Sequence, residues 1–349
     1  MRKASPLFFI VLVCSLSFLV LADAFKVQAD DSTNGSIVET KTFSSAENLR
    51  ILLAQEPIKP IVRDNQLNIP KVLLGEMLFF DKRLSADNSL SCASCHRFEL
   101  GGADAQQFAT GINGQKGRTN SPTVFNSRYN IAQFWDGRAQ TLELQALSPV
   151  ENPLEMGAKW PDVVVKLSQD KLLVQNVKRI YNQPISAAIV TDAIAEYERS
   201  LVTLNAPFDQ YLLGDSEAIS NQAKQGYLLF KSYGCISCHQ GISVGSNMFH
   251  QLGIMIAYFA PVDELLLKRD LGRFNVTQQD RDKYRFKVPS LRLVTQTAPY
   301  FHDGSVKTLH EAIKVMAKYQ LLGDIPDVDV ELIIEFLKTL TGKYERLSS

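Results

Sequence analysis

Cys92-Ala93-Ser94-Cys95-His96 and Cys235-Ile236-Ser237-Cys238-His239 are two copies of one pattern, C-x-x-C-H. This pattern is typical of covalent haem c attachment. Two thiols at this spacing can add to the two vinyl groups on one edge of a porphyrin, and the adjacent histidine can then bind the iron. The sequence therefore predicts two haem c groups, held by Cys92, Cys95, Cys235 and Cys238, with His96 and His239 as iron ligands.

Other uses of these cysteines fit the pattern less well. Four cysteines in an exported chain would normally suggest disulfides, but here each pair is followed at once by histidine. A redox-active C-x-x-C does not need that histidine in both copies. A zinc site would bring together pairs about 15–20 residues apart, whereas these pairs lie in different halves of the chain.

The N-terminus predicts a secretory signal peptide over residues 1–24. Arg2 and Lys3 precede an apolar run, Leu7–Leu21, which is shorter than the ~20 residues that span a bilayer. Ala22-Asp23-Ala24 offers small residues for cleavage after Ala24. We expect an exported, periplasmic protein without stable membrane insertion, with an uncleaved anchor as the alternative.

Composition and apolar spacing predict an all-α fold. The 349 residues carry 37 basic and 37 acidic side chains, so no broad basic field favours nucleic acid. Apolar residues recur at three- and four-residue spacing, which predicts helices in Val163–Tyr181, Ile185–Leu204, Ala218–Phe230 and Val330–Leu340. Gly111–Pro122 is rich in loop-forming residues.

A weak internal repeat predicts two tandem class I cytochrome c-like domains, each with one covalently bound haem c. Gly75-x-x-Leu78-Phe79 precedes the first haem motif, and Gly226-x-x-Leu229-Phe230 precedes the second. Asn205-Ala206-Pro207 is the expected boundary. The domains are then 46–205 and 206–343, after a flexible segment 25–45, with a C-terminal tail able to pack back on the first domain.

A second axial ligand decides what each iron can do, because histidine/methionine ligation suits electron transfer and an open position suits reaction with an oxidant. No histidine lies between His96 and His239. Three methionines follow the second motif, namely Met248, Met255 and Met316. A methionine in a helix is more often a packing residue than a ligand, so the residues alone leave this choice open.

Further segments resemble the bacterial di-haem cytochrome c peroxidase family, to which MauG also belongs. The resemblance runs from about Gly75 to Tyr319 and includes both haem motifs. Its matching segments are Gly101-Gly102-x-Asp104, Asn120-x-Pro122-Thr123, Phe134-Trp135-Asp136-Gly137-Arg138-Ala139, Gln145, Glu155-Met156-Gly157, Lys287-Val288-Pro289-Ser290-Leu291-Arg292 and Thr297-Ala298-Pro299-Tyr300-Phe301-His302-Asp303-Gly304.

The resemblance implies a division of labour between the two irons. The His96 haem would be the low-potential site for peroxide, and the His239 haem, with Met316 as second ligand, would receive electrons. Glu155 would act as general acid and base, and Gln145 would orient peroxide. Trp135 would lie between the haems and assist electron transfer.

The resemblance also implies a calcium ion at Asn120, Thr297 and Pro299, where backbone carbonyls supply much of the coordination. For His302 it favours a structural or haem-propionate role. His250 and His310 are interpreted as ordinary polar residues. The family is often dimeric, so a homodimer stays open.

One departure concerns the peroxidatic iron. Many family members carry a histidine before the position of Asn120 that caps this iron in the oxidised enzyme. Here Ile112 takes that place, and isoleucine cannot bind iron. We therefore hypothesise that the iron of the first haem has an open coordination position, or binds only water there, when both irons are ferric.

The sequence thus favours a periplasmic peroxidase that reduces hydrogen peroxide to water with electrons from a small cytochrome c or cupredoxin. A MauG-like oxidase acting on a protein is one alternative, although MauG carries a tyrosine at the place of Met316. A non-enzymatic di-haem electron carrier is the other.

Overall fold

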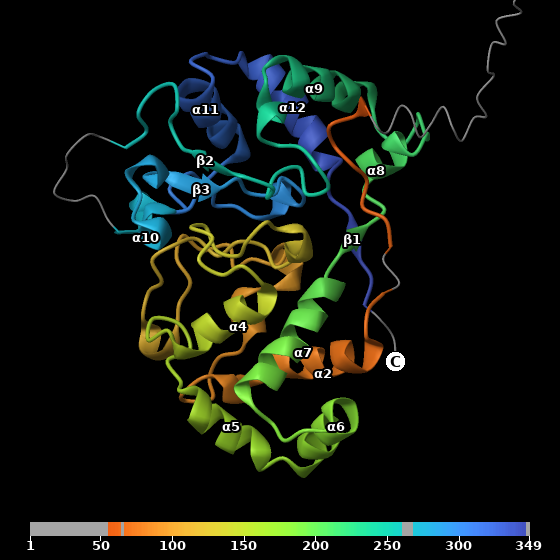
Figure 1. Cartoon of the computed structure of the whole chain (residues 1–349). Coiled ribbons are helices and arrows are strands. Elements are labelled where there is room, and N and C mark those ends of the chain that lie inside the picture. Colours follow the sequence, from red (N-terminus) through yellow and green to blue (C-terminus); the bar gives the residue numbers. More distant parts are fainter. Residues whose placement is uncertain (1–54, 64–65, 260–267, 347–349) are drawn as a thin grey trace, which may run out of the picture. The chain divides into compact units, whose positions relative to one another are not determined.

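Two pairs of crossing helices form the centre of the two halves of the chain. Helix α2 (Ile69–Phe79) crosses α7 (Ala187–Ser200), and α9 (Asn221–Ser232) crosses α12 (Asp327–Lys338) (Figure 1). A Cβ at Gly75 would lie 1.9 Å from the carbonyl oxygen of Ala193, and one at Gly226 would lie 1.9 Å from that of Leu332. Only glycine permits such close backbone contact. The repeated glycine in the sequence therefore marks the same helix crossing twice.

The computed structural model describes residues 55–63, 66–259 and 268–346, which belong to one compact unit. The expected signal peptide 1–24 and flexible segment 25–45 lie outside these residues. Among the described residues, no helix combines the length and apolar character needed to cross a membrane. The remaining helices are α3 (Cys92–Cys95), α4 (Leu142–Glu151), α5 (Trp160–Ser168), α6 (Lys171–Tyr181), α8 (Pro207–Leu212), α10 (Phe274–Thr277) and α11 (Leu309–Gln320).

Two short antiparallel strand pairs accompany the helices. Strand β1 (Thr203–Leu204) pairs with β4 (Lys343–Tyr344), and β2 (Phe249–Gln251) pairs with β3 (Arg285–Lys287). In the second pair Phe249 stands opposite Lys287. The protein is thus helix-rich with little sheet, as the apolar spacing predicts. The strand pairs were not predicted, because two or three residues are too few to show an alternating pattern.

Three of the four predicted helical segments contain one helix each, namely α7, α9 and α12. The fourth, Val163–Tyr181, was interpreted as one stretch but contains two helices, α5 and α6. The break has a local cause. Asp170 accepts hydrogen bonds from the backbone N–H groups of Leu172 and Leu173, which caps α6 and starts a new helix.

Buried apolar side chains form two clusters, one in each half of the sequence. The first includes Leu78, Phe79, Val163 and Ile194. The second surrounds an aromatic group and contains Phe208, Tyr227, Phe230, Phe336 and also Ile58, from near the start of the described chain. Tyr344 packs instead on the first cluster, with ring centroids 5.4 Å from those of Phe98 and Phe125.

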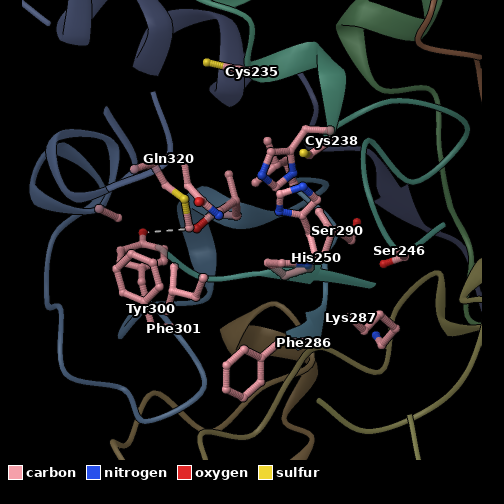
Figure 2. A pocket seen from close by; sticks show the side chains of 18 of the residues that line it. Cys235, Cys238, Ser246, His250, Phe286, Lys287, Ser290, Tyr300, Phe301 and Gln320 are labelled. Atoms are coloured by element: carbon pink, nitrogen blue, oxygen red, sulfur yellow. Dashed lines mark hydrogen bonds between the residues drawn. The ribbon is translucent and has the colours of Figure 1, made fainter. Parts of the chain in front are cut away.

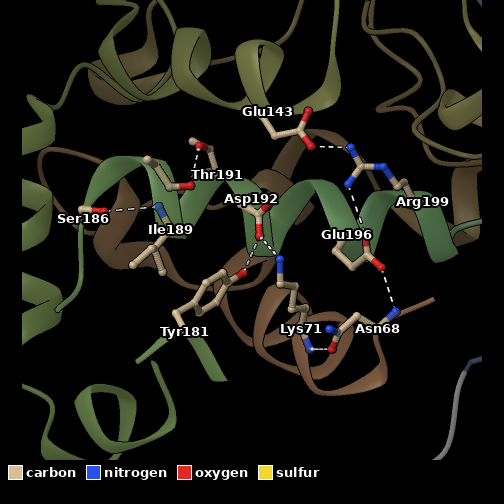
Figure 3. Close-up of polar contacts among 11 residues, drawn as sticks. Asn68, Lys71, Glu143, Tyr181, Ser186, Ile189, Thr191, Asp192, Glu196 and Arg199 are labelled. Carbon is tan, nitrogen blue, oxygen red and sulfur yellow. Dashed lines mark hydrogen bonds and ion pairs between the residues drawn. The ribbon is translucent and has the colours of Figure 1, made fainter. Parts of the chain in front are cut away.

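The polar side of α7 attaches this helix to its neighbours (Figure 3). Asp192 accepts hydrogen bonds from Lys71 Nζ at 2.8 Å and from the Tyr181 hydroxyl at 2.7 Å, so it joins α7 to α2 and α6. Arg199 pairs with Glu143 at the start of α4. The Arg199–Glu143 pair thus connects α7 to α4, which carries the Gln145 side chain.

A buried ion pair joins α8 to the segment after β3. Asp209 accepts hydrogen bonds from Arg292 Nη1 at 3.0 Å and Nη2 at 2.9 Å, and both side chains are almost fully buried. Arg292 also donates to the carbonyl oxygens of Lys59 and Ile242. One guanidinium thereby connects four segments of the second half.

Candidate haem and peroxide sites

The two C-x-x-C-H segments fold into the same tight turn. Cys92–Cys95 forms α3 and Cys235–Ser237 forms a 3₁₀ turn. The His96 N–H donates to the Cys92 carbonyl oxygen at 3.0 Å, and the His239 N–H donates to that of Cys235 at the same distance. Each turn thus gathers two thiols and an imidazole. The four thiols are partly buried, and none forms a disulfide.

Hydrogen bonding at Nδ1 fixes the tautomer of both motif histidines. Nδ1 of His96 lies 3.1 Å from the carbonyl oxygen of Gly102, and Nδ1 of His239 lies 3.3 Å from that of Val244. A carbonyl can only accept, so Nδ1 carries the proton and Nε2 keeps its lone pair for a metal. Burial lowers the pKa of His96, and it lowers the pKa of His239 to about 4. Both rings are therefore neutral at pH 7, as iron ligation requires.

A cavity of about 510 Å³ opens beside the second motif (Figure 2). Its walls include Cys235, Cys238, His239 and Met316. Apolar side chains from α9, α11 and α12 form part of the surface, together with residues from the segments around β2 and β3. A large apolar cavity that contains two thiols, a neutral imidazole and a thioether is suited to a haem c with histidine and methionine on its iron. Met316 on α11 therefore shares one space with His239.

Two further histidines reach the same cavity. His302 is 2% exposed, its Nε2 lies 2.8 Å from Asp270 Oδ1, and its ring stacks on Phe286. His250 on β2 also lines the cavity, with Nδ1 3.2 Å from the Gln251 carbonyl oxygen. From the sequence, His250 was interpreted as an ordinary polar residue. In the structure it lies in the wall of the cavity beside the second motif.

Trp135 lines the cavity and contacts two other parts of the chain. Its indole N–H donates to the Asn120 carbonyl oxygen at 2.9 Å. Its own carbonyl oxygen accepts the Lys287 N–H at 2.8 Å. The ring is thus held between a segment that follows the first motif and a strand that follows the second.

The three residues implied for calcium, Asn120, Thr297 and Pro299, all line the same cavity. The Asn120 side-chain nitrogen donates to the Gln106 carbonyl oxygen at 2.9 Å. Among the described residues, no three His, Cys, Asp or Glu side chains gather as a metal site.

Glu155 lies near the first motif. Burial raises the pKa of its carboxyl, against the lowering effects of a hydrogen bond from Asn152 and of the charge of Arg138. Asn152 Nδ2 lies 2.7 Å from Glu155 Oε1. Burial raises the pKa of the Cys95 thiol to about 11, and the charge of Glu155 contributes to this rise. The carboxyl is thus within electrostatic reach of the first thiol pair, and it keeps its proton to a higher pH than an ordinary carboxyl does.

Ile112 packs on the Glu155 segment. Its N–H donates to the Glu155 carbonyl oxygen at 2.8 Å, and its side chain is buried. The side chain reaches Gly157, where an added Cβ would lie 2.4 Å from Ile112 Cδ1. The residue that replaces the expected histidine is therefore part of the wall beside Glu155. Gln145, on α4, has a half-buried side chain.

The burial of two charged residues near the motifs was not predicted. Lys287 lines the cavity at 7% exposure. Glu198 on α7 is also buried, and burial raises its pKa to about 8. The charge of Glu198 contributes to the raised pKa of Cys92. A single lysine or glutamate in a sequence is usually exposed, so nothing local predicted that either side chain is buried, and Lys287 was named only as part of a matching segment.

Comparison with protein families gives one family model. The model described as "Di-haem cytochrome c peroxidase" matches residues 70–217. Among curated proteins, the chain is 45% identical to cytochrome c peroxidase Ccp of Escherichia coli over 291 residues, which cover 83% of this chain and 62% of that protein. The chain thus spans less than two thirds of this relative.

Two other relatives are covered more fully. The chain is 40% identical to cytochrome c551 peroxidase of Nitrosomonas europaea, over 84% of this chain and 86% of that one. It is 41% identical to cytochrome c551 peroxidase of Pseudomonas aeruginosa, over 78% and 79%. Among solved structures, a MauG-like protein associated with microbial copper homeostasis is 28% identical, with a TM-score of 0.70 over 82% of this chain and 93% of that chain.

Proposed function

We propose a peroxidase function from one premise: this chain belongs to the di-haem cytochrome c peroxidase family. The reaction reduces one hydrogen peroxide to two waters and consumes two electrons and two protons. The electrons come singly from a small reduced protein, a cytochrome c or a cupredoxin. The observation that carries the proposal is the half-buried Glu155 carboxyl, which Asn152 holds by a hydrogen bond and whose segment packs on Ile112.

The proposal assigns one haem c to each cysteine pair, with His96 and His239 as proximal ligands. Their neutral rings and fixed Nδ1–H bonds support this assignment. When bound, the haems supply iron centres that pass single electrons and, at the first site, a coordination position for the oxidant. Met316 would be the second protein ligand of the iron at the second site. Its place in the cavity with His239 supports this assignment. A methionine here favours a peroxidase over a MauG-like oxidase, which carries tyrosine at this position.

Glu155 carries the proton chemistry in this proposal. Asn152 holds the carboxyl through Oε1, and Oε2 accepts no hydrogen bond from the described residues. A carboxylate in this position can take a proton from the near oxygen of peroxide and return it to the far oxygen as water leaves. Gln145 would orient the peroxide by hydrogen bonding. Because Ile112 offers no ligand atom, the first iron would be open to peroxide without prior reduction.

Trp135 is the proposed route for electrons between the two irons. Its two main hydrogen bonds, to Asn120 and from Lys287, support a fixed position between the segments of both motifs. Calcium at Asn120, Thr297 and Pro299 would stabilise this same region, since Asn120 also receives the Trp135 indole N–H.

The domain and export assignments complete the proposal. The two buried clusters support a division into two cytochrome c-like domains near Asn205. The basic and apolar pattern of residues 1–24 supports export to the periplasm, where haem c proteins receive their cofactor.

The test is peroxide-dependent oxidation of several reduced cytochromes and cupredoxins by the purified protein, with Glu155→Gln beside the parent. General acid–base catalysis contributes about 10²–10⁴-fold, so we expect a loss of that order in Glu155→Gln. Glu151→Gln, an exposed change at the end of the same helix–loop segment, is the matched control. Unchanged turnover in Glu155→Gln would remove this residue from the mechanism, and a parent that oxidises none of the donors would refute the function.

A further inference from the structure

In the described wall of the cavity beside the second motif, there is one ammonium group and no carboxylate. Of the described residues that line it, Lys287 is the sole lysine or arginine, and none is aspartate or glutamate. Lys287 is 7% exposed. Among the described residues, no side-chain hydrogen bond or ion pair is made by its ammonium group. The backbone of Lys287 is fixed on β3, where its N–H donates to the Trp135 carbonyl oxygen.

An ammonium group in this setting needs a partner. A buried charge without a counter-charge is destabilising, and burial lowers the pKa of Lys287 to about 8. The group therefore still carries a proton for most of the time at pH 7. Since no described residue of the cavity wall offers a carboxylate, a bound molecule is the natural source of the negative charge.

The direction of the cavity indicates which part of a bound molecule meets Lys287. In Figure 2 Cys235 lies at one side of the cavity and Lys287 lies across it, beyond Cys238 and His250. Thioether bonds would hold a haem by its vinyl edge at the two cysteines. The two propionate carboxylates of a haem lie on the opposite edge of the ring, so attachment at the cysteines directs them away from Cys235 and towards the far wall.

We propose that the Lys287 ammonium binds a propionate carboxylate of the haem attached at Cys235 and Cys238, an inference that rests on the haem assignment of the proposed function. The pair places a positive charge at the haem edge that faces Trp135. A cation there favours the form of the haem that has gained an electron, and therefore raises its midpoint potential. Lys287 thus helps to make the second haem the one that accepts electrons.

The experiment is a spectroscopic redox titration of the protein with both haems attached, without peroxide or donor. The variants are Lys287→Met and Lys287→Gln, which remove the charge, and Lys287→Arg, which keeps it. Lys283→Met is the control, because the Lys283 side chain is 41% exposed and pairs with Asp280, close by in sequence. Two neutral variants are used so that the result does not depend on one of them folding.

We expect the ratio of reduced to oxidised second haem at a fixed potential to fall about tenfold in the neutral variants, which is ~59 mV for one electron. Lys287→Arg should restore most of the parent value, and the first haem and Lys283→Met should not change. Equal potentials in the parent and both neutral variants would overturn the inference, as would equal shifts of both haems.

A free anion is the other source of the negative charge. The titration is therefore repeated with phosphate and chloride replaced by a large, weakly binding anion. A parent-to-variant difference that persists supports the propionate, and a difference that disappears overturns it. Mass spectrometry of the peptide that contains Cys235 tests haem attachment separately, and an unmodified peptide would overturn both proposals. A protein without peroxidase activity that still shows the shift would refute only the function.

Discussion

Ile112 and Glu155 are joined through their backbones, with the Ile112 N–H 2.8 Å from the Glu155 carbonyl oxygen. The contact leaves little room on either side. A Cβ at Gly111 would lie 2.1 Å from the Leu154 carbonyl oxygen, and Ile112 Cδ1 fills the space over Gly157. The loop with the apolar replacement is therefore packed on the loop with the proposed acid–base group, and a side chain at position 112 acts directly on that site.

The first prediction concerns this position. In the fully oxidised protein we expect a high-spin signal from the first haem in electron paramagnetic resonance, because Ile112 supplies no ligand atom. Ile112→His should convert that signal to low spin and introduce a need for prior reduction, while Ile112→Leu should behave as the parent. A parent whose first haem is purely low-spin with a nitrogen ligand would refute the open site.

The second prediction is the pH dependence of turnover. Glu155 must be ionised to accept a proton, and burial raises its pKa above the usual 4.5. Activity should therefore fall as the pH drops through this raised value, at a higher pH than for an ordinary carboxyl. Asn152→Ala removes a hydrogen bond that lowers the Glu155 pKa, so the acid limb of kcat/KM should move to still higher pH.

Asn176→Ala is the matched control for this shift, since Asn176 lies on α6 and its side chain accepts a bond from Arg179. Its profile should coincide with that of the parent. An acid limb that stays in place in Asn152→Ala would show that Glu155 does not set it.

The third prediction separates the methionines. Met316→Leu should lower the midpoint potential of the second haem, because methionine/histidine ligation raises it. Met255→Leu should leave the potential unchanged, since Met255 is 52% exposed. Visible redox titration checks both. A shift in the Met255 variant alone would move the ligand assignment away from Met316.

The fourth prediction concerns stability. Arg292→Met leaves Asp209 buried without a counter-charge, so we expect the free energy of unfolding to fall by about 3–5 kcal/mol in denaturant titration. Lys338→Met breaks an exposed pair with Glu335 and should cost at most about 1 kcal/mol. Similar losses of unfolding free energy in the two variants would show that the buried pair stabilises the protein no more than the exposed pair does.

Much of this structure could be predicted from the sequence, but some elements could not. The helices α7, α9 and α12 could be predicted because each shows a long apolar face, and both haem turns follow from five consecutive residues. The break at Asp170 was missed because a capping aspartate interrupts the chain without interrupting the apolar spacing. The β2–β3 pair, and with it the burial of Lys287, depends on contacts between segments far apart in the chain. Such contacts leave no local pattern.

The pairing of β4 with β1 has a consequence for how the protein is made. Tyr344 packs against the rings of Phe98 and Phe125 and closes this aromatic cluster. Phe98 follows the first C-x-x-C-H motif by two residues. During synthesis, Tyr344 emerges long after that motif. The aromatic cluster of Phe98 and Phe125 therefore stays incompletely closed until the chain has been made as far as Tyr344.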